Sequence, residues 1–174
     1  MPPSTNWSEL LGRARHSAVH LEMRDTYAAP SEAEPITLWR KTGFADTDPN
    51  SAWWHDWSVL VSDAITRGVA VRRARIVSEP VSEYTRWLHA ITPGNLAAGE
   101  QVRWLPRANA TDLRLPGSDF WVFDDTLVRF GQFDGNGCPL PPQYREEPEV
   151  IQLCLDAFEG VWKRGVDHEE YEIR

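Results

Sequence analysis

The sequence predicts an α+β protein built on a mixed β-sheet of about five strands, with helices on its faces. Segments with helical periodicity alternate with short strand-like segments, and a sheet covered by helices is the economical way to bury both. The residues from Phe120 to Phe123 are all apolar, which is typical of a strand buried on both faces. The chain has 174 residues, the length of one domain that can bury a core without disulfides or metals.

The first part of the chain is expected to contain three helices and one strand. A helix is expected at residues 7–16, and the alternation of apolar and polar side chains at residues 19–24 indicates a half-buried strand. Further helices are expected at residues 31–41 and 49–67. In the second of these, apolar side chains recur every three or four positions and Pro49 occupies the first turn.

The second part of the chain supplies most of the sheet. Strands are expected at residues 69–77, 101–106, 119–123 and 126–133. Helices are expected at residues 78–91 and 148–163, and the Thr-Pro-Gly-Asn sequence at 92–95 is expected to end the first of them. The single domain then covers residues 1–165, and the acidic segment 166–174 is expected to be a frayed tail.

Composition limits the classes of partner. The net charge of −8 disfavours direct binding to nucleic acid, because such proteins need clustered Lys and Arg to displace counterions. No apolar run approaches the ~18 residues that span a bilayer, and the polar start does not resemble a signal peptide. Cys138 and Cys154 are the only cysteines, which favours reduced thiols. We therefore expect a cytoplasmic protein with no membrane partner.

The usual metal and cofactor motifs are missing. His16 and His20 have a spacing that holds a metal on one helix, but the helix is expected to end near His16, so the two side chains would not share a face. The glycine-containing segment 94–99 lacks the Lys-Ser/Thr pair of a phosphate-binding loop. The sequence therefore assigns no metal site, no cofactor and no catalytic residue.

A candidate ligand site is built around the central arginines. Arg73 and Arg75 lie on one face of the strand at 69–77, where they could bind a phosphate or carboxylate in a bidentate manner, or else pair with Glu79, Glu83 or other acids. Arg103 and Arg107 could complete this site only if the two strands are neighbours.

Asp124 and Asp125 follow an apolar strand, where carboxylates can act as acid and base, although aspartates also favour tight turns. The candidate ligand-binding residues are Arg73, Arg75, Arg103, Trp104, Asp124 and Asp125.

Four segments carry a likeness to known proteins: residues 20–27, 67–80, 104–107 and 119–125. Together they resemble an uncharacterised family of short actinobacterial proteins, and the most specific block is the Val-Arg-Arg-x-Arg-x-Val-Ser-Glu-Pro sequence at 71–80. The likeness covers residues 7–162. Members of this family look like companions of helix-turn-helix regulators and are often encoded beside them, so the resemblance implies such a regulator as a partner.

The sequences at 68–72 and 119–125 also resemble half of a phospholipase-D-like domain. Catalysis in that superfamily needs a His-x-Lys-x4-Asp motif. With Asp125 as the motif Asp, the His and Lys positions hold Ser118 and Phe120, and with Asp124 they hold Gly117 and Asp119. The resemblance therefore implies a degenerate domain, without that chemistry, that serves ligand sensing or dimerisation.

Two function classes follow from these observations. The favoured hypothesis is a non-enzymatic regulatory or interaction domain that binds a protein partner, such as a DNA-binding regulator, or a small anionic ligand, and that could form a homodimer. The alternative is a small enzyme acting on a phosphorylated or carboxylated metabolite, with arginines holding the anion and Asp124 or Asp125 as acid or base. The alternative requires these side chains to converge in one pocket.

Overall fold

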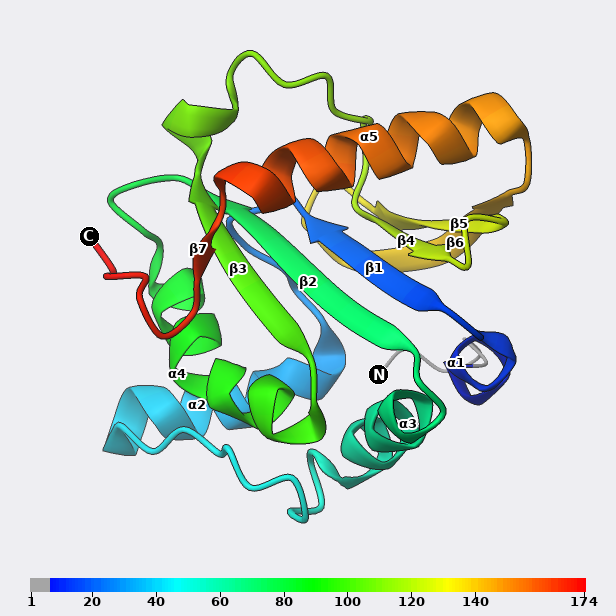
Figure 1. Cartoon of the computed structure of the whole chain (residues 1–174). Helices are drawn as coiled ribbons and strands as arrows, with labels where there is room; N and C mark the ends of the chain where they lie inside the picture. The colour runs from blue at the N-terminus through cyan, green and yellow to red at the C-terminus, as the bar shows by residue number, and fades with distance from the viewer. Residues whose placement is uncertain (1–6) are drawn as a thin grey trace.

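The computed structural model describes residues 7–174, which form a seven-stranded mixed sheet and five α-helices (Figure 1). The strands are β1 (Ser17–Glu22), β2 (Ala70–Val77), β3 (Gln101–Pro106), β4 (Phe120–Phe123), β5 (Leu127–Phe133), β6 (Pro139–Arg145) and β7 (Val166–Asp167). The helices are α1 (Trp7–Arg13), α2 (Ala33–Thr42), α3 (His55–Thr66), α4 (Glu83–Ala98) and α5 (Pro148–Arg164). The predicted α+β class is confirmed, with β6 and β7 added to the five expected strands.

The sheet has the order β6-β5-β4-β1-β2-β3-β7. Strands β1, β2 and β3 are parallel, and β4, β5, β6 and β7 are antiparallel to their neighbours. Helix α5 crosses one face, while α2, α3 and α4 lie under the other (Figure 1). Both faces are therefore covered, and apolar cores form on each side of the sheet.

The β4–β5 hairpin turn begins with Asp124 and Asp125, which have φ values of 48° and 55°. Phe123 pairs with Leu127, so the turn contains Asp124, Asp125 and Thr126. Its first two residues adopt positive φ, a conformation that Asp tolerates better than most residues. The carboxylate of Asp124 accepts hydrogen bonds from the backbone N–H groups of Arg15, His16 and Ser17, at 2.7, 2.7 and 3.0 Å. This side chain therefore joins the turn to the start of β1.

Several predicted helix boundaries are wrong: α1 ends at Arg13 rather than at residue 16, and α4 begins at Glu83 rather than at residue 78. The helix expected from residue 49 begins only at His55, because the preceding loop is held by local turns in which Asp46 and Asp48 accept hydrogen bonds from backbone N–H groups two residues ahead. Helix α4 continues past the expected stop to Ala98 with Pro93 inside it. There Gly94 lies against the Trp54 ring, so tertiary packing outweighs the local helix-breaking signal.

The end of the chain is packed rather than frayed. Residues 166–167 pair with β3, and Tyr171 stacks on Trp104 with ring centroids 5.5 Å apart and planes 6° apart. The Tyr171 hydroxyl donates to Glu79, and the carbonyl of Arg174 accepts from Val81 N–H. These contacts fix the segment whose charge suggested a solvated tail.

The other missed strand, β6, lies at the opposite edge of the sheet and contains three prolines. Pro weakens a strand pattern because it lacks an N–H group, but it is tolerated on an edge strand. None of the helices within residues 7–174 combines the length and apolar composition needed to cross a bilayer.

Candidate functional site

Arg73 and Arg75 project together from β2 beneath the sheet, as their strand positions predicted, and both meet Glu22 of β1. One Nη of Arg73 contacts Glu22 Oε1, and the Nε of Arg75 donates to Glu22 Oε2 at 2.7 Å. Glu100, which follows α4, accepts from the Nε of Arg73 at 2.8 Å. Thr92 of α4 accepts from Arg75 Nη1 at 2.6 Å. The arginines therefore lie in a buried ion-pair network.

The acids that pair with these arginines are not the ones nearest in the sequence. Glu79 accepts a hydrogen bond from Tyr171, and Glu83 pairs with Arg40. Strand β2 ends at Val77, so both glutamates lie beyond the strand and cannot reach back to side chains in its middle. The neighbouring β1 and the loop after α4 supply the counter-ions instead.

Tryptophan rings pack against the ion-pair network. The guanidinium of Arg75 lies 4.9 Å from the centroid of Trp104, and that of Arg73 lies 5.5 Å from Trp121 and 5.9 Å from Trp57. Trp57 also donates its indole N–H to Glu100 at 2.6 Å. A cation over an indole face is stabilised where water has been removed, which makes these rings suitable neighbours for buried guanidinium groups.

The ion-pair network is electrically balanced. Arg73, Arg75, Glu22 and Glu100 are each less than 10% exposed, and they contribute two positive and two negative charges. Burial disfavours the charge of Glu22, but Arg75 and Arg73 hold the pKa of that carboxyl well below its ordinary value. Burial opposes the charge of Glu100 as well, but Arg73 and hydrogen bonds from Asn95 and Trp57 lower its pKa. The two positive charges are therefore paired with the two negative charges, and the network has no unpaired positive charge to attract an anionic ligand.

His20 completes the ion-pair network on the β1 side. Its ring stacks on Trp121 at a centroid distance of 4.3 Å, with Nε2 3.1 Å from Glu22. Burial lowers the pKa of this imidazole despite the adjacent carboxylate. His16 lies outside the network, at the backbone contact with Asp124. Among residues 7–174 no group of three or more His, Cys, Asp or Glu side chains is arranged to hold a metal.

Arg103 does not join Arg73 and Arg75. In register Arg103 lies opposite Ala74, so its side chain points to the other face of the sheet. There it donates to Asp167 at 2.7 Å and lies 4.6 Å from the centroid of Trp162 in α5. Trp104, one position along, faces Arg75 and donates its indole N–H to His168.

Asp124 and Asp125 also lie away from the arginines. The turn is bonded to Ser17 at the start of β1, whereas Arg75 is paired in register with Glu22 at its end. Five residues of extended strand separate these positions, a distance of about 16 Å. The arginines and aspartates therefore do not converge in the way that the enzyme alternative requires, because the aspartates close the hairpin.

A second cluster of titratable groups lies beside the ion-pair network. Asp119, just before β4, accepts hydrogen bonds from the hydroxyl of Tyr27 and from Met23 N–H. Tyr84 in turn packs 5.8 Å from Tyr27 and donates to Glu32 at 2.6 Å. Burial raises the pKa of Asp119 to about 6 and also raises the pKa of Glu32. Sequence reasoning missed this cluster because Tyr27 and Asp119 are 92 residues apart.

A family model for a domain of unknown function (DUF6879) matches residues 5–173, which is almost the whole chain. The chain belongs to this family. No curated protein matches the DUF6879 chain.

Two similar solved structures are a phospholipase D family member, Nuc from Salmonella typhimurium, and TrmBL2, described as an archaeal chromatin protein with a novel mode of DNA binding. The first is 14% identical with a TM-score of 0.49, covering 92% of this chain and 87% of the other. The second is 12% identical with a TM-score of 0.45, covering 91% and 48%.

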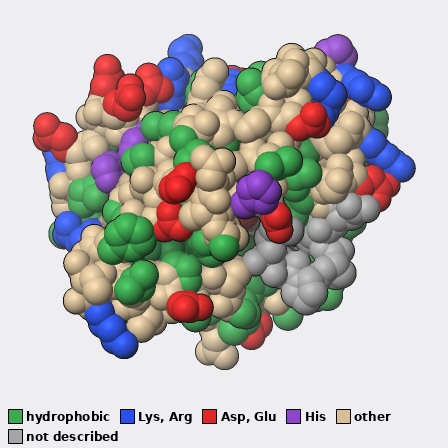
Figure 2. Space-filling model, turned by 90° about the horizontal axis from the view of Figure 1, so that it is seen from below, with side chains coloured by type: hydrophobic (Ala, Val, Ile, Leu, Met, Phe, Trp, Pro, Cys, Tyr) green, Lys and Arg blue, Asp and Glu red, His purple; other side chains and the backbone are tan. Residues whose placement is uncertain are grey.

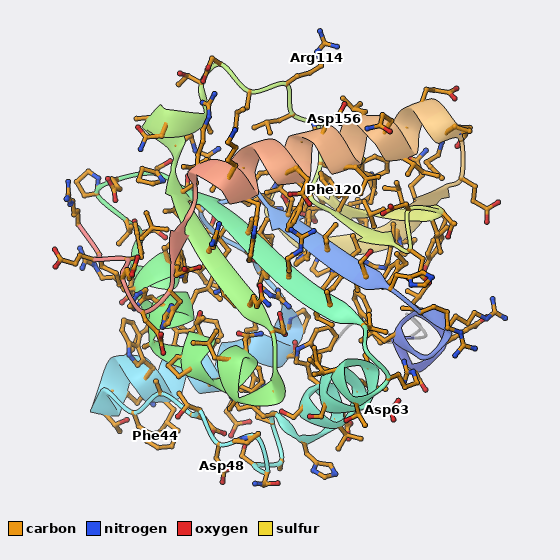
Figure 3. All side chains as sticks on the ribbon, in the orientation of Figure 1. Phe44, Asp48, Asp63, Arg114, Phe120 and Asp156 are labelled. Atoms are coloured by element: carbon orange, nitrogen blue, oxygen red, sulfur yellow. The ribbon has the colours of Figure 1, made fainter. Side chains whose placement is uncertain are left out.

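Two surface hollows of the DUF6879 chain lie away from the ion-pair network. One of about 350 Å³ lies between α5 and the segment before β4, near Arg114 and Asp156 (Figure 3). The other, of about 540 Å³, is an open depression at residues 144–147. Neither is lined by Arg73, Arg75, Trp104 or the hairpin aspartates.

The surface of the DUF6879 chain carries a group of unburied apolar side chains around α2. Among the described residues six large hydrophobic side chains are exposed, and four of them lie between residues 38 and 65. Leu38 is 45% exposed and Phe44 is 57% exposed. Trp39 follows Leu38 on α2 and is half-buried, and the half-buried Trp53 lies nine residues after Phe44, near Ser31 at the start of the α2 region. We refer to Leu38, Trp39, Phe44 and Trp53 as the α2 surface. Apolar and aromatic side chains of this kind are typical of sites that bind other proteins.

Proposed function

We propose that this chain is a non-enzymatic protein-interaction domain that binds a DNA-binding regulator through the α2 surface. The observation that carries the proposal is the exposure of Leu38 and Phe44 on α2 and directly after it, with the half-buried Trp39 between them in the chain. Large apolar and aromatic side chains at the centre of a contact supply most of the binding free energy in protein complexes. The regulator is proposed as the partner because the sequence resembles companions of helix-turn-helix proteins.

The interior favours this proposal over the binding of a small anion. A phosphate or carboxylate could reach Arg73 or Arg75 only by displacing Glu22 or Glu100, and the displaced carboxylate would then be buried without its counter-ion. The structure also disfavours the enzyme alternative, because the arginines and the hairpin aspartates do not face one another. The ion-pair network instead has the character of a structural element.

The test is co-purification with defined partners. The chain is co-expressed with individual helix-turn-helix regulators from its own genome, and each mixture is separated by size-exclusion chromatography with mass measurement. We expect one regulator to co-elute, and the double substitution Leu38→Ser and Phe44→Ser to weaken its binding at least about tenfold. The mass of the free chain also tests the homodimer.

The matched control changes two equally exposed side chains on β6. Leu140 is 48% exposed and Tyr144 is 46% exposed, so Leu140→Ser with Tyr144→Ser removes a similar apolar area elsewhere, together with the hydrogen bond between Tyr144 and Arg129. We expect this variant to bind the regulator like the unmodified chain. The proposal is refuted if no regulator co-elutes, or if the β6 variant loses binding while the α2 variant keeps it.

A further inference from the structure

The α2 surface continues into a loop with a fixed conformation. Trp54 is buried, donates its indole N–H to the carbonyl of Asp46 at 2.7 Å, and lies so close to Gly94 that a Cβ there would be 2.5 Å from its ring. At the end of the same loop, the indole N–H of Trp53 donates to the carbonyl of Ser31 at 3.2 Å. The loop between α2 and α3 therefore presents Phe44 on a pre-organised base, and little entropy is lost when a partner binds it.

Carboxylates outnumber basic side chains along this part of the chain. Residues 32–67 contain six carboxylates and three basic side chains, a difference of three negative charges. Of the bases, Arg67 pairs with Asp63 and Arg40 pairs with Glu83. Four of the acids, Glu34, Asp46, Asp48 and Asp56, form no ion pair within residues 7–174. Phe44 and Asp48 both project from the underside of the molecule (Figure 3).

The same face shows the combination of charge and apolar area directly. Seen from below, hydrophobic and acidic side chains gather across the middle of the face, and Lys and Arg lie towards its edges (Figure 2). A partner that covers this face must bring apolar side chains for the aromatic area and positive charge for the carboxylates. Opposite charges at the rim of an interface also speed association and select against acidic partners.

We infer that the segment of the partner that binds here is an amphipathic helix with cationic side chains, an inference that rests on the proposed function. The α2 surface is built from a helix and a loop and offers no sheet edge, so an extended segment would find no strand to pair with. An amphipathic helix carries an apolar stripe and charged flanks at once, which matches Phe44 and Leu38 with acids beside them.

The experiment uses two fluorescent helical peptides of about 18 residues, five turns in length. Both have the same Leu stripe, and the polar positions are Lys in one and Glu in the other. Binding to the full chain is followed by fluorescence anisotropy between about 50 and 300 mM salt, a range over which screening of surface charge increases strongly. We expect the Lys peptide to bind at least about tenfold more tightly than the Glu peptide, and to weaken as salt rises.

Two variants locate the binding site. Leu38→Ser with Phe44→Ser should weaken the Lys peptide about tenfold or more at every salt concentration. Asp46→Asn with Asp48→Asn should weaken it several-fold at low salt and flatten its salt dependence. Asn keeps the side-chain oxygen that accepts the turn hydrogen bonds, so this second variant removes charge without opening the loop. Glu146→Gln with Glu149→Gln removes the same charge from an exposed site outside the α2 surface and should change little.

The outcomes separate this inference from the proposed function. The inference is overturned if the Glu peptide binds as well as the Lys peptide, or if the Asp46/Asp48 variant behaves like the Glu146/Glu149 control, even when regulator binding still depends on Phe44. Regulator binding that ignores Phe44 overturns the proposed function, whatever the peptides do.

Discussion

Replacing Asp119 with Asn should remove a specific part of the dependence of stability on pH. The Asp119 carboxylate is only 4% exposed and is held by the Tyr27 hydroxyl and by Met23 N–H. Asn has nearly the same shape, keeps an oxygen for Met23 N–H, and can place its amide N–H₂ opposite the Tyr27 oxygen. The substitution therefore changes the ability to ionise more than the packing.

The magnitude follows from the pKa. Burial raises the pKa of Asp119 from 3.8 to about 6, despite the opposing effect of both hydrogen bonds. A rise of this size corresponds to about 3 kcal/mol, since one pKa unit is about 1.4 kcal/mol. The folded protein binds this proton more tightly than the unfolded chain does. Its contribution to stability is therefore fully present below about pH 4 and is lost as the pH rises through about 6.

The assay is urea unfolding of the unmodified chain and of Asp119→Asn at a series of pH values between about 3 and 7. The free energy of unfolding of the unmodified chain, minus that of the variant, should fall by about 3 kcal/mol across this range and then stay level. The subtraction removes groups that titrate in both proteins. Asp156→Asn, at an exposed side chain on α5, serves as the control and should show no such trend. A difference that is flat or rises with pH would refute the reasoning.

Three further substitutions test single contacts by urea unfolding. Glu100→Gln should destabilise the chain by about 3–5 kcal/mol, because Arg73 loses a buried counter-ion, and a loss below about 1 kcal/mol would contradict the ion-pair network. Gly94→Ala should cost about 1–3 kcal/mol and shift the tryptophan emission, because the new methyl group meets the Trp54 ring, and an unchanged spectrum would show that the ring does not lie there. Asp124→Ala should cost about 1–3 kcal/mol, because three backbone N–H groups lose their acceptor, and an unchanged free energy of unfolding would show that the turn does not need this side chain.

Five of the seven strands were predictable, because each is a short segment of apolar or alternating residues with turn residues around it. The position of Arg73 and Arg75 on one face also followed from the period of two in a strand. Their partners did not follow, since Glu22 is 51 residues from Arg73 and Glu100 is 27 residues away. Local sequence indicates which way a side chain points, but the identity of the neighbouring strand and loop comes only from the fold.

The polar positions of β1 show a more general reason why the buried ion pairs could not be predicted from the sequence. Alternation of apolar and polar residues predicted a half-buried strand, with His20 and Glu22 on a solvent-facing side. Helices cover both faces of the sheet, so the polar side of β1 is enclosed as well, and its burial pattern has no exposed residue. A polar face on such a strand therefore indicates a buried polar network, which here consists of His20, Glu22 and the two arginines of β2.

Tryptophans lie both in the interior and in the proposed binding surface. Trp57, Trp104 and Trp121 have a clear structural task, because each lies against a guanidinium group that has been removed from water. Leu38 and Phe44 have no such structural role. They remain about half exposed, on a helix and a loop that the rest of the chain holds in place. Exposed apolar area of this kind favours association with another protein. A loop that is already held in one conformation loses little entropy when it binds. The interior thus holds the α2 surface in place, and in the proposed complex the acids near it would favour a partner segment with positive charge.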